Sequence, residues 1–94
     1  MEILNDNGDK KGAFYIKKDN QRIAGMTYVY AGASKIIIDH TEVDSSLKGQ
    51  GVGYKLVEEA VQFARKNNLK ITPLCPFAAA VFKKKAADYN DVKA

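Results

Sequence analysis

Residues 41–68 read TEVDSSLKGQGVGYKLVEEAVQFARKNN, and this stretch decides the fold. Gly49, Gly51 and Gly53 stand at alternate positions, after an extended apolar segment and before a helical pattern. Glycines at such a junction let the chain turn tightly and let a ligand touch the backbone. The helix start adds unpaired N–H groups and a positive dipole end. The stretch predicts a phosphate or pyrophosphate site at Gly49–Tyr54; a turn needed only for tight packing is the plainer alternative.

Working outward, the pattern on each side of the turn predicts the other elements. Apolar residues recur three and four positions apart from residue 52 and stop at Asn67-Asn68, which predicts an amphipathic helix. Alternating and β-branched segments predict strands at 12–18, 21–32, 34–43 and 69–75, and the run Ile36-Ile37-Ile38 suggests a strand buried on both faces. Pro76 suits the first turn of a second helix at 76–89, whereas 1–11 looks like a loose start.

These elements predict one fold class. The order is strand, strand, strand, helix, strand, helix, and the strand–helix–strand unit should be right-handed and parallel. We therefore expect an α+β (α/β layered) fold, with helices packed on a mostly antiparallel sheet, in a single domain spanning residues 1–94.

Composition limits the classes of function. The chain has 94 residues, 46% of them hydrophobic, and no apolar run approaches the roughly 20 residues of a membrane span. It has one cysteine and no apolar signal core, so we expect a cytoplasmic protein. A net charge of +4 suits an anionic ligand, but the one lysine cluster, Lys83-Lys84-Lys85, reads as a solvated helix face, so nucleic acid is an unlikely partner.

Two common phosphate motifs do not fit the glycine turn. A Walker P-loop starting at Gly49 would need a second glycine where Tyr54 stands. The dinucleotide fingerprint starting at Gly51 would need a glycine where Leu56 stands.

The segment VDSSLKGQGVGYKLVEEAVQFARKNNLK instead resembles motif A of the GNAT acyltransferase superfamily, strand, loop, [QR]-x-x-G-x-[GA], helix. The match puts Lys48 at the Gln/Arg position and Gly51 and Gly53 at the fixed glycines. In that family the turn holds the pyrophosphate of coenzyme A, and the pantetheine arm runs along the end of the preceding strand. The resemblance covers about residues 12–87 and implies a minimal GNAT-like fold.

A second, weaker match lies on the last helix. The family pattern N-x-x-A-x-x-x-[YF] falls on Cys75, Ala78 and Phe82, so a cysteine replaces asparagine and no tyrosine hydroxyl can protonate the leaving thiolate. The resemblance implies a coenzyme A site made of the following residues: Glu42, Val43, Lys48, Gly49, Gln50, Gly51, Val52, Gly53, Tyr54 and Phe82.

Three residues are candidates for catalysis: Cys75, His40 and Glu42. If Pro76 begins the helix, Cys75 is its N-cap, where the dipole favours a thiolate. His40 and Glu42 share a strand face, and histidine ordinarily changes charge near neutral pH. His40 could act as base towards Cys75 or towards an amine, with Glu42 assisting. A buried structural cysteine and exposed strand residues are the plainer alternatives, and one His and one Cys are too few for a typical metal site.

The sequence thus predicts an acetyl-CoA-binding protein that moves the acetyl group to an amine, directly or through Cys75. The acceptor, a small molecule or a protein, is not identified by the sequence. The alternative is a non-catalytic acyl-CoA-binding or sensing module. A small nucleic-acid-binding protein is a third possibility that leaves the glycine turn unexplained. We expect a monomer or weak homodimer.

Overall fold

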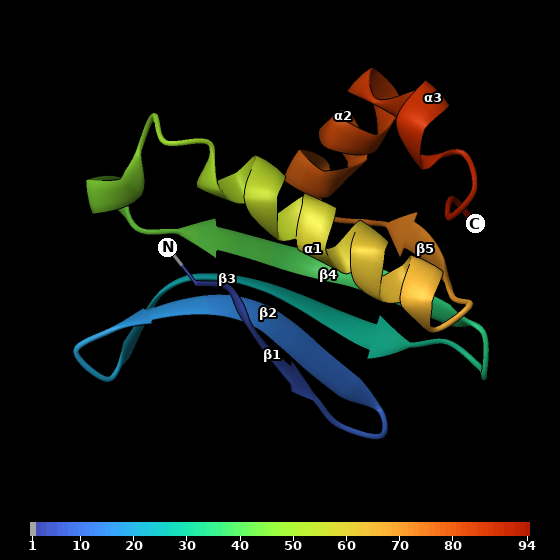
Figure 1. Cartoon of the computed structure of the whole chain (residues 1–94), viewed down its shortest axis with the longest axis horizontal. Helices are drawn as coiled ribbons and strands as arrows, with labels where there is room; N and C mark the ends of the chain where they lie inside the picture. The colour runs from blue at the N-terminus through green and yellow to red at the C-terminus, as the bar shows by residue number, and fades with distance from the viewer. Residues whose placement is uncertain (1) are drawn as a thin grey trace.

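The computed structural model describes residues 2–94 and places the helices on one side of a five-stranded sheet (Figure 1). The elements are, in chain order, β1 (Leu4–Asn7), β2 (Lys11–Lys18), β3 (Gln21–Tyr30), β4 (Lys35–Val43), the 3₁₀ turn η1 (Ser45–Leu47), α1 (Val52–Lys66), β5 (Lys70–Pro73), α2 (Pro76–Lys84) and α3 (Ala86–Tyr89). The sheet order is β1-β2-β3-β4-β5, and only β4 and β5 run parallel. The expected α+β architecture is therefore confirmed.

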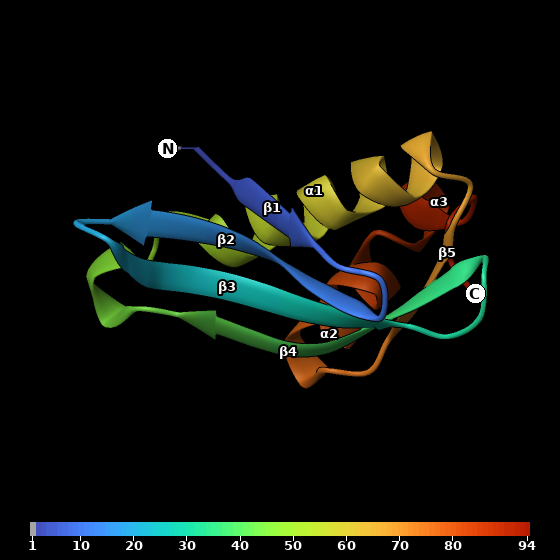
Figure 2. The ribbon, with the colours of Figure 1, turned by 90° about the horizontal axis from the view of Figure 1, so that it is seen from below.

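Three details differ from expectation. The N-terminal segment is not loose: β1 pairs with β2, and its Asn7 accepts a 2.8 Å hydrogen bond from the hydroxyl of buried Tyr28. The last helix is interrupted at Lys85, whose backbone (φ −109°, ψ 33°) leaves the helical region. Ile37 is only half-buried, because no helix covers its face of the sheet (Figure 2).

The core lies between the sheet and α1, as the apolar stripe of that helix predicts. Each buried branched side chain contributes roughly 1.5–3 kcal/mol relative to exposure. The stripe consists of Val52, Leu56, Val57, Ala60, Val61 and Ala64. It packs on the alternate strand residues Phe14, Ile16, Ala24, Met26, Tyr28, Ile36 and Ile38. No helix in residues 2–94 combines the length and the apolar character needed to cross a bilayer.

Two irregularities in β4 shape the site. The pairing with β3 shifts between Thr27 and Tyr28, so that Asp39 is an extra residue and β4 bulges there. On its other side, β4 is paired with β5 only up to Ile38, whose carbonyl accepts bonds from the N–H groups of Leu74 (2.9 Å) and Cys75 (3.1 Å). The last five residues of β4 therefore have no strand on that side.

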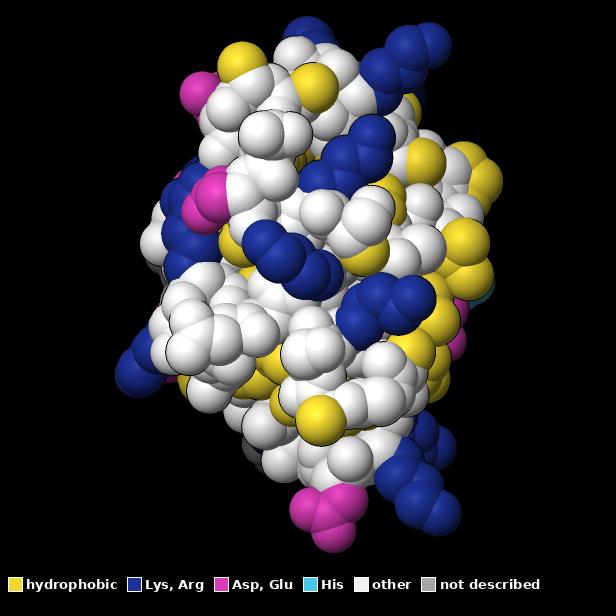
Figure 3. Space-filling model, turned by 90° about the vertical axis from the view of Figure 1, so that its right-hand side faces the viewer, with side chains coloured by type: hydrophobic (Ala, Val, Ile, Leu, Met, Phe, Trp, Pro, Cys, Tyr) yellow, Lys and Arg dark blue, Asp and Glu magenta, His cyan; other side chains and the backbone are white. Residues whose placement is uncertain are grey.

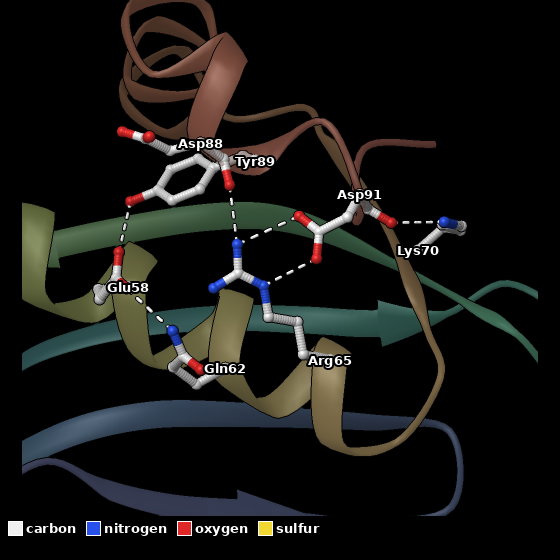
Figure 4. A network of polar contacts seen from close by, with 7 residues as sticks. All are labelled: Glu58, Gln62, Arg65, Lys70, Asp88, Tyr89 and Asp91. Carbon is white, nitrogen blue, oxygen red and sulfur yellow. Dashed lines mark hydrogen bonds and ion pairs between the residues drawn. The ribbon is translucent and has the colours of Figure 1, made fainter.

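A polar network ties the C-terminal segment to α1 (Figure 4). Arg65 donates to both carboxylate oxygens of Asp91, at 2.9 and 3.1 Å, and to the carbonyl of Asp88 at 2.7 Å. Tyr89 donates its hydroxyl to Glu58 Oε2 at 2.7 Å. This bond lowers the pKa of Glu58, while burial and then the same bond raise the pKa of Tyr89.

Candidate functional site

The three glycines of the turn serve two different purposes. Gly49 (φ 81°) and Gly51 (φ 70°) have left-handed backbones that other residues adopt at a cost, and a Cβ there would meet nothing within 4 Å. Gly53 lies inside α1, where a Cβ would come within 2.5 Å of the Phe77 ring. The tight-packing alternative therefore explains Gly53, whereas Gly49 and Gly51 leave open space beside the turn.

The start of α1 is uncapped by any side chain. Gly51 is its N-cap, and the first helical hydrogen bond runs from Lys55 N to Gly51 O at 3.1 Å. The N–H groups of Val52, Gly53 and Tyr54 thus have no helical acceptor. The first turn contains no acidic residue that would offset the dipole. Three free amides beside open space form a suitable site for an anion.

A groove of about 350 Å³ adjoins these amides. It runs between the end of β4, the turn and the start of α2, and Tyr54 and Phe77 make an edge-on aromatic pair on it, with ring centroids 5.7 Å apart. We call it the glycine groove; its lining is Thr41, Val43, Leu47, Lys48, Gly49, Gly51, Val52, Gly53, Tyr54 and Phe77. Lys48 supplies a cation, whereas the exposed Gln50 is not part of the lining.

The unpaired edge of β4 borders the same groove. Asp44 N donates to Ile23 O of the neighbouring segment at 2.8 Å. Because backbone groups alternate sides along an antiparallel strand, those of Glu42 face β3 and those of Thr41 and Val43 face the free edge. Val43, and not Glu42, therefore presents main-chain hydrogen-bonding groups to the groove.

Cys75 is the N-cap of α2, as expected. Its Sγ accepts the N–H of Ala78 at 3.3 Å and lies 3.1 Å from Thr41 Oγ1. Only 5% of the residue is exposed. The sulfur is thus held next to the free edge of β4, on the helical side of the sheet.

His40 and Glu42 lie on the opposite side of the sheet. They share a face, as expected, and His40 Nε2 is 3.2 Å from Glu42 Oε1. Their side chains are 66% and 79% exposed. Thr41, between them, points the other way, to Cys75. Among residues 2–94 the histidine and the cysteine therefore make no hydrogen bond, and the expected His40–Cys75 pair is corrected to two separate pairs, His40–Glu42 and Thr41–Cys75.

Phe82 also departs from expectation. It is 1% exposed and packs in the core against Tyr89, with ring centroids 5.1 Å apart, so it does not line the glycine groove. The ring that does so is Phe77, which the sequence analysis missed. The signal in the sequence was Gly53, because a glycine inside a helix often has a packing reason, here a neighbouring ring that leaves no room for a side chain.

The chain is similar to known proteins. A family model described as GCN5-related N-acetyl-transferase matches residues 13–92. A GCN5-like protein from Staphylococcus aureus has 42% sequence identity over 99% of this chain and 87% of that chain, with a TM-score of 0.75. No curated protein matches.

More distant structures share the fold alone. Tetrahymena GCN5 has 20% identity and a TM-score of 0.65, and the match covers 83% of this chain and 51% of that chain. A Clostridium acetobutylicum protein solved with acetyl-CoA has 18% identity and a TM-score of 0.66, covering 81% and 56%. The chain spans about half the length of these two proteins.

Proposed function

The chain belongs to the GCN5-related N-acetyltransferase family, and on that premise we propose that it binds acetyl-CoA in the glycine groove and transfers the acetyl group to an amine. One observation carries the proposal: the amides of Val52, Gly53 and Tyr54 have no helical acceptor, and these residues line the glycine groove together with Gly49 and Gly51. The Clostridium acetobutylicum protein of this fold was solved with acetyl-CoA.

The pyrophosphate suits the start of α1. Its oxygens can accept the free N–H groups, and the helix dipole favours the negative charge. Lys48 on the groove wall adds a positive charge. Tyr54 and Phe77 offer apolar surface to the part of the molecule next to the phosphates.

The pantetheine arm suits the free edge of β4. It carries amide groups, and the main chains of Thr41 and Val43 lack a strand partner on that side. Bonds from this edge would align the arm with β4 and bring the thioester towards Thr41 and Cys75. The thioester of acetyl-CoA would supply an activated acetyl carbon, and the edge of β4 would hold that carbon in place for attack.

Direct transfer fits the side chains better than a covalent route through Cys75. The sulfur is buried and bonded to Thr41 and to the N–H of Ala78, and its side of the sheet holds no histidine. His40 and Glu42 are exposed, so an amine can reach them from solvent. In this route His40 accepts a proton from the amine and Glu42 orients the imidazole.

Calorimetry with acetyl-CoA, followed by intact-mass measurement of the same sample, tests the proposal. We expect binding without a stable acetyl adduct, and release of free thiol only when an amine is added. Cys75→Ser replaces the sulfur of the N-cap by a hydroxyl oxygen that can accept the same bond, so it should fold and retain transfer. An adduct that disappears in Cys75→Ser would establish the covalent route instead, and absence of binding would refute the proposal.

A non-catalytic acyl-CoA-binding module is the second candidate. It is favoured by Phe82, since no tyrosine hydroxyl stands at the position that the family uses to protonate the leaving thiolate. This candidate predicts binding without thiol release for every amine offered.

A further inference from the structure

The glycine groove is lined by two residues with a side-chain hydroxyl group, Tyr54 and Thr41. Tyr54 lies in the first turn of α1, beside the free amides, and its ring pairs with Phe77. Thr41 lies on the stretch of β4 that has no strand on its other side. A pantetheine arm aligned on this edge would bring the thioester to Thr41, whereas Tyr54 would stay beside the phosphates. Thr41 is therefore the hydroxyl of the groove lining at the reacting end.

The strand itself does not require a hydroxyl at position 41. Threonine suits a strand because it is β-branched, but valine suits it equally and stands two positions further along the same edge, at Val43. Within residues 2–94, the hydroxyl makes one hydrogen bond, to Cys75 Sγ at 3.1 Å. Sulfur is a weak partner in such bonds, so this contact adds little to stability. The hydroxyl of Thr41 is therefore not explained by the formation of β4.

The N-cap role of Cys75 fixes the direction of the bond to Thr41. Sγ already uses a lone pair to accept the N–H of Ala78 at 3.3 Å. If Thr41 also donated to Sγ, the thiol hydrogen would be buried without an acceptor, because Cys75 is only 5% exposed. If the thiol donates to Thr41 Oγ1 instead, the hydroxyl hydrogen points to the groove, where water or a ligand can accept it. The second arrangement satisfies both donors and is therefore preferred.

Acetyl transfer needs a donor of this kind. Breaking the C–S bond of the thioester puts negative charge on the sulfur of coenzyme A. A hydrogen-bond donor that is already aimed at this sulfur stabilises the charge as it develops, because no reorganisation is needed at that moment. The free hydroxyl of Thr41, on the edge of β4 beside the groove, is in a position to act in this way.

The cationic side chains of the protein are less well placed for this task. Lys48 lines the groove at the turn, next to the proposed phosphates. His40 lies on the opposite side of the sheet from Thr41 and is paired with Glu42. Figure 3 shows Lys and Arg side chains over much of the face at the right of Figure 1, whereas β4 ends at the left. A neutral hydroxyl, and not a cation, is thus the donor that the fold offers to the sulfur.

We propose that the Thr41 hydroxyl donates a hydrogen bond to the thioester sulfur as coenzyme A leaves, and that Cys75 is a positioning residue that turns this hydroxyl to the groove. The inference rests on the proposed function. The neutral amine attacks the thioester carbon, the N–C bond forms, and the nitrogen gives one proton to His40. The C–S bond breaks with its electron pair going to sulfur. Coenzyme A leaves as a thiolate and takes a proton from solvent, to which His40 returns its own.

Titration of bound coenzyme A tests the inference without turnover. The probe is coenzyme A with an isotopically labelled carbon next to the sulfur, bound to saturation, and NMR follows the signal of this carbon against pH. A hydrogen bond to the thiolate favours the charged form, so the pKa of the bound thiol should be lower in the unaltered protein than in Thr41→Val. Thr41→Ser keeps the hydroxyl and should restore the lower pKa. Valine suits a strand, so Thr41→Val should fold.

Kinetics with butylamine, a simple primary amine, give a second readout. We expect kcat of Thr41→Val to fall about 10- to 100-fold with KM for acetyl-CoA unchanged, because the bond strengthens only as charge develops. Thr41→Ser should recover most of the rate. Thr72→Val is the matched control, since Thr72 lies on β5 and does not line the groove, and it should behave as the unaltered protein.

The outcomes separate this inference from the proposed function. Equal pKa values of the bound thiol in the unaltered protein and in Thr41→Val, or an unchanged kcat in folded Thr41→Val, would overturn the inference while leaving acetyl-CoA binding intact. If the unaltered protein binds acetyl-CoA without transfer to butylamine, the titration alone decides the inference. Failure of acetyl-CoA to bind the unaltered protein would overturn both.

Discussion

Replacing Gly51 by alanine separates the backbone role of the turn from its role towards a ligand. The backbone of Gly51 is left-handed (φ 70°, ψ 22°), which costs alanine about 1–2 kcal/mol. Alanine returns about 0.4–1 kcal/mol by restricting the unfolded chain. The net loss is about 1 kcal/mol, which lowers Tm by about 4–8 °C in a domain of this size.

Gly32→Ala provides a matched control. Gly32 lies in the turn between β3 and β4, also has a left-handed backbone (φ 81°), and likewise has nothing within 4 Å of a Cβ. Its loss of stability should therefore equal that of Gly51→Ala. Only at Gly51 does the new methyl group stand beside the free amides of α1. Losing one bond to a charged phosphate costs about 1.5–3 kcal/mol, or about 10- to 100-fold in Kd.

Thermal melts followed by circular dichroism give the change in Tm of each variant. Calorimetry below both melting temperatures gives the Kd for acetyl-CoA. We expect equal falls in Tm and a weaker acetyl-CoA complex for Gly51→Ala alone. Equal acetyl-CoA affinity in the two variants would refute the assignment of the anion to this turn. An unchanged Tm in both would refute the strain argument.

Further predictions concern charge and the C-terminal network. Lys48→Ala should weaken acetyl-CoA binding several-fold at low salt and less at high salt, by calorimetry at two ionic strengths. Lys18→Ala, a lysine that does not line the groove, should have a smaller effect. Tyr89→Phe loses the bond to Glu58 and should cost about 1 kcal/mol near neutral pH. Because that bond lowers the pKa of Glu58, its stabilisation exists above the unfolded pKa of about 4.3 and disappears as pH falls through the folded value. Melts of both proteins should therefore converge as the pH falls below the lowered pKa of folded Glu58; a constant gap would contradict this.

The regular parts of the fold were predictable from periodicity. The apolar stripe of α1 predicts one helix, and each alternating or β-branched pattern from β2 to β5 predicts one strand. The polar strand β1 was not predictable, because its sequence LNDN has no alternating apolar residues. Its position depends in part on a bond from the hydroxyl of Tyr28, which is distant in the sequence. The break at Lys85 was also hidden, since no Gly or Pro marks it.

The candidate site likewise has parts that the sequence predicts and parts that it does not. Local chemistry predicted the glycine turn and the N-cap Cys75, because both depend on adjacent residues. The separation of His40 from Cys75 depends on the face of the sheet on which each side chain lies. The bulge at Asp39 shifts the alternation of side chains in β4, so that His40 lies on the face opposite to Ile38, and nothing in the sequence indicates this bulge. The burial of Phe82 depends on how α2 packs, which spacing alone does not determine.

The free edge of β4 has a consequence for aggregation. The outer edge of β5 is covered by the C-terminal residues, since Ile71 N donates to Val92 O at 2.6 Å and Ala94 N to Ile71 O at 2.9 Å. The opposite edge is the short, polar β1, which discourages pairing with another chain. The end of β4 is different: unpaired main chain lies there beside exposed Val43 and Leu74. A strand of a second molecule could add at this edge, so a ligand bound along β4 would also protect the protein from self-association.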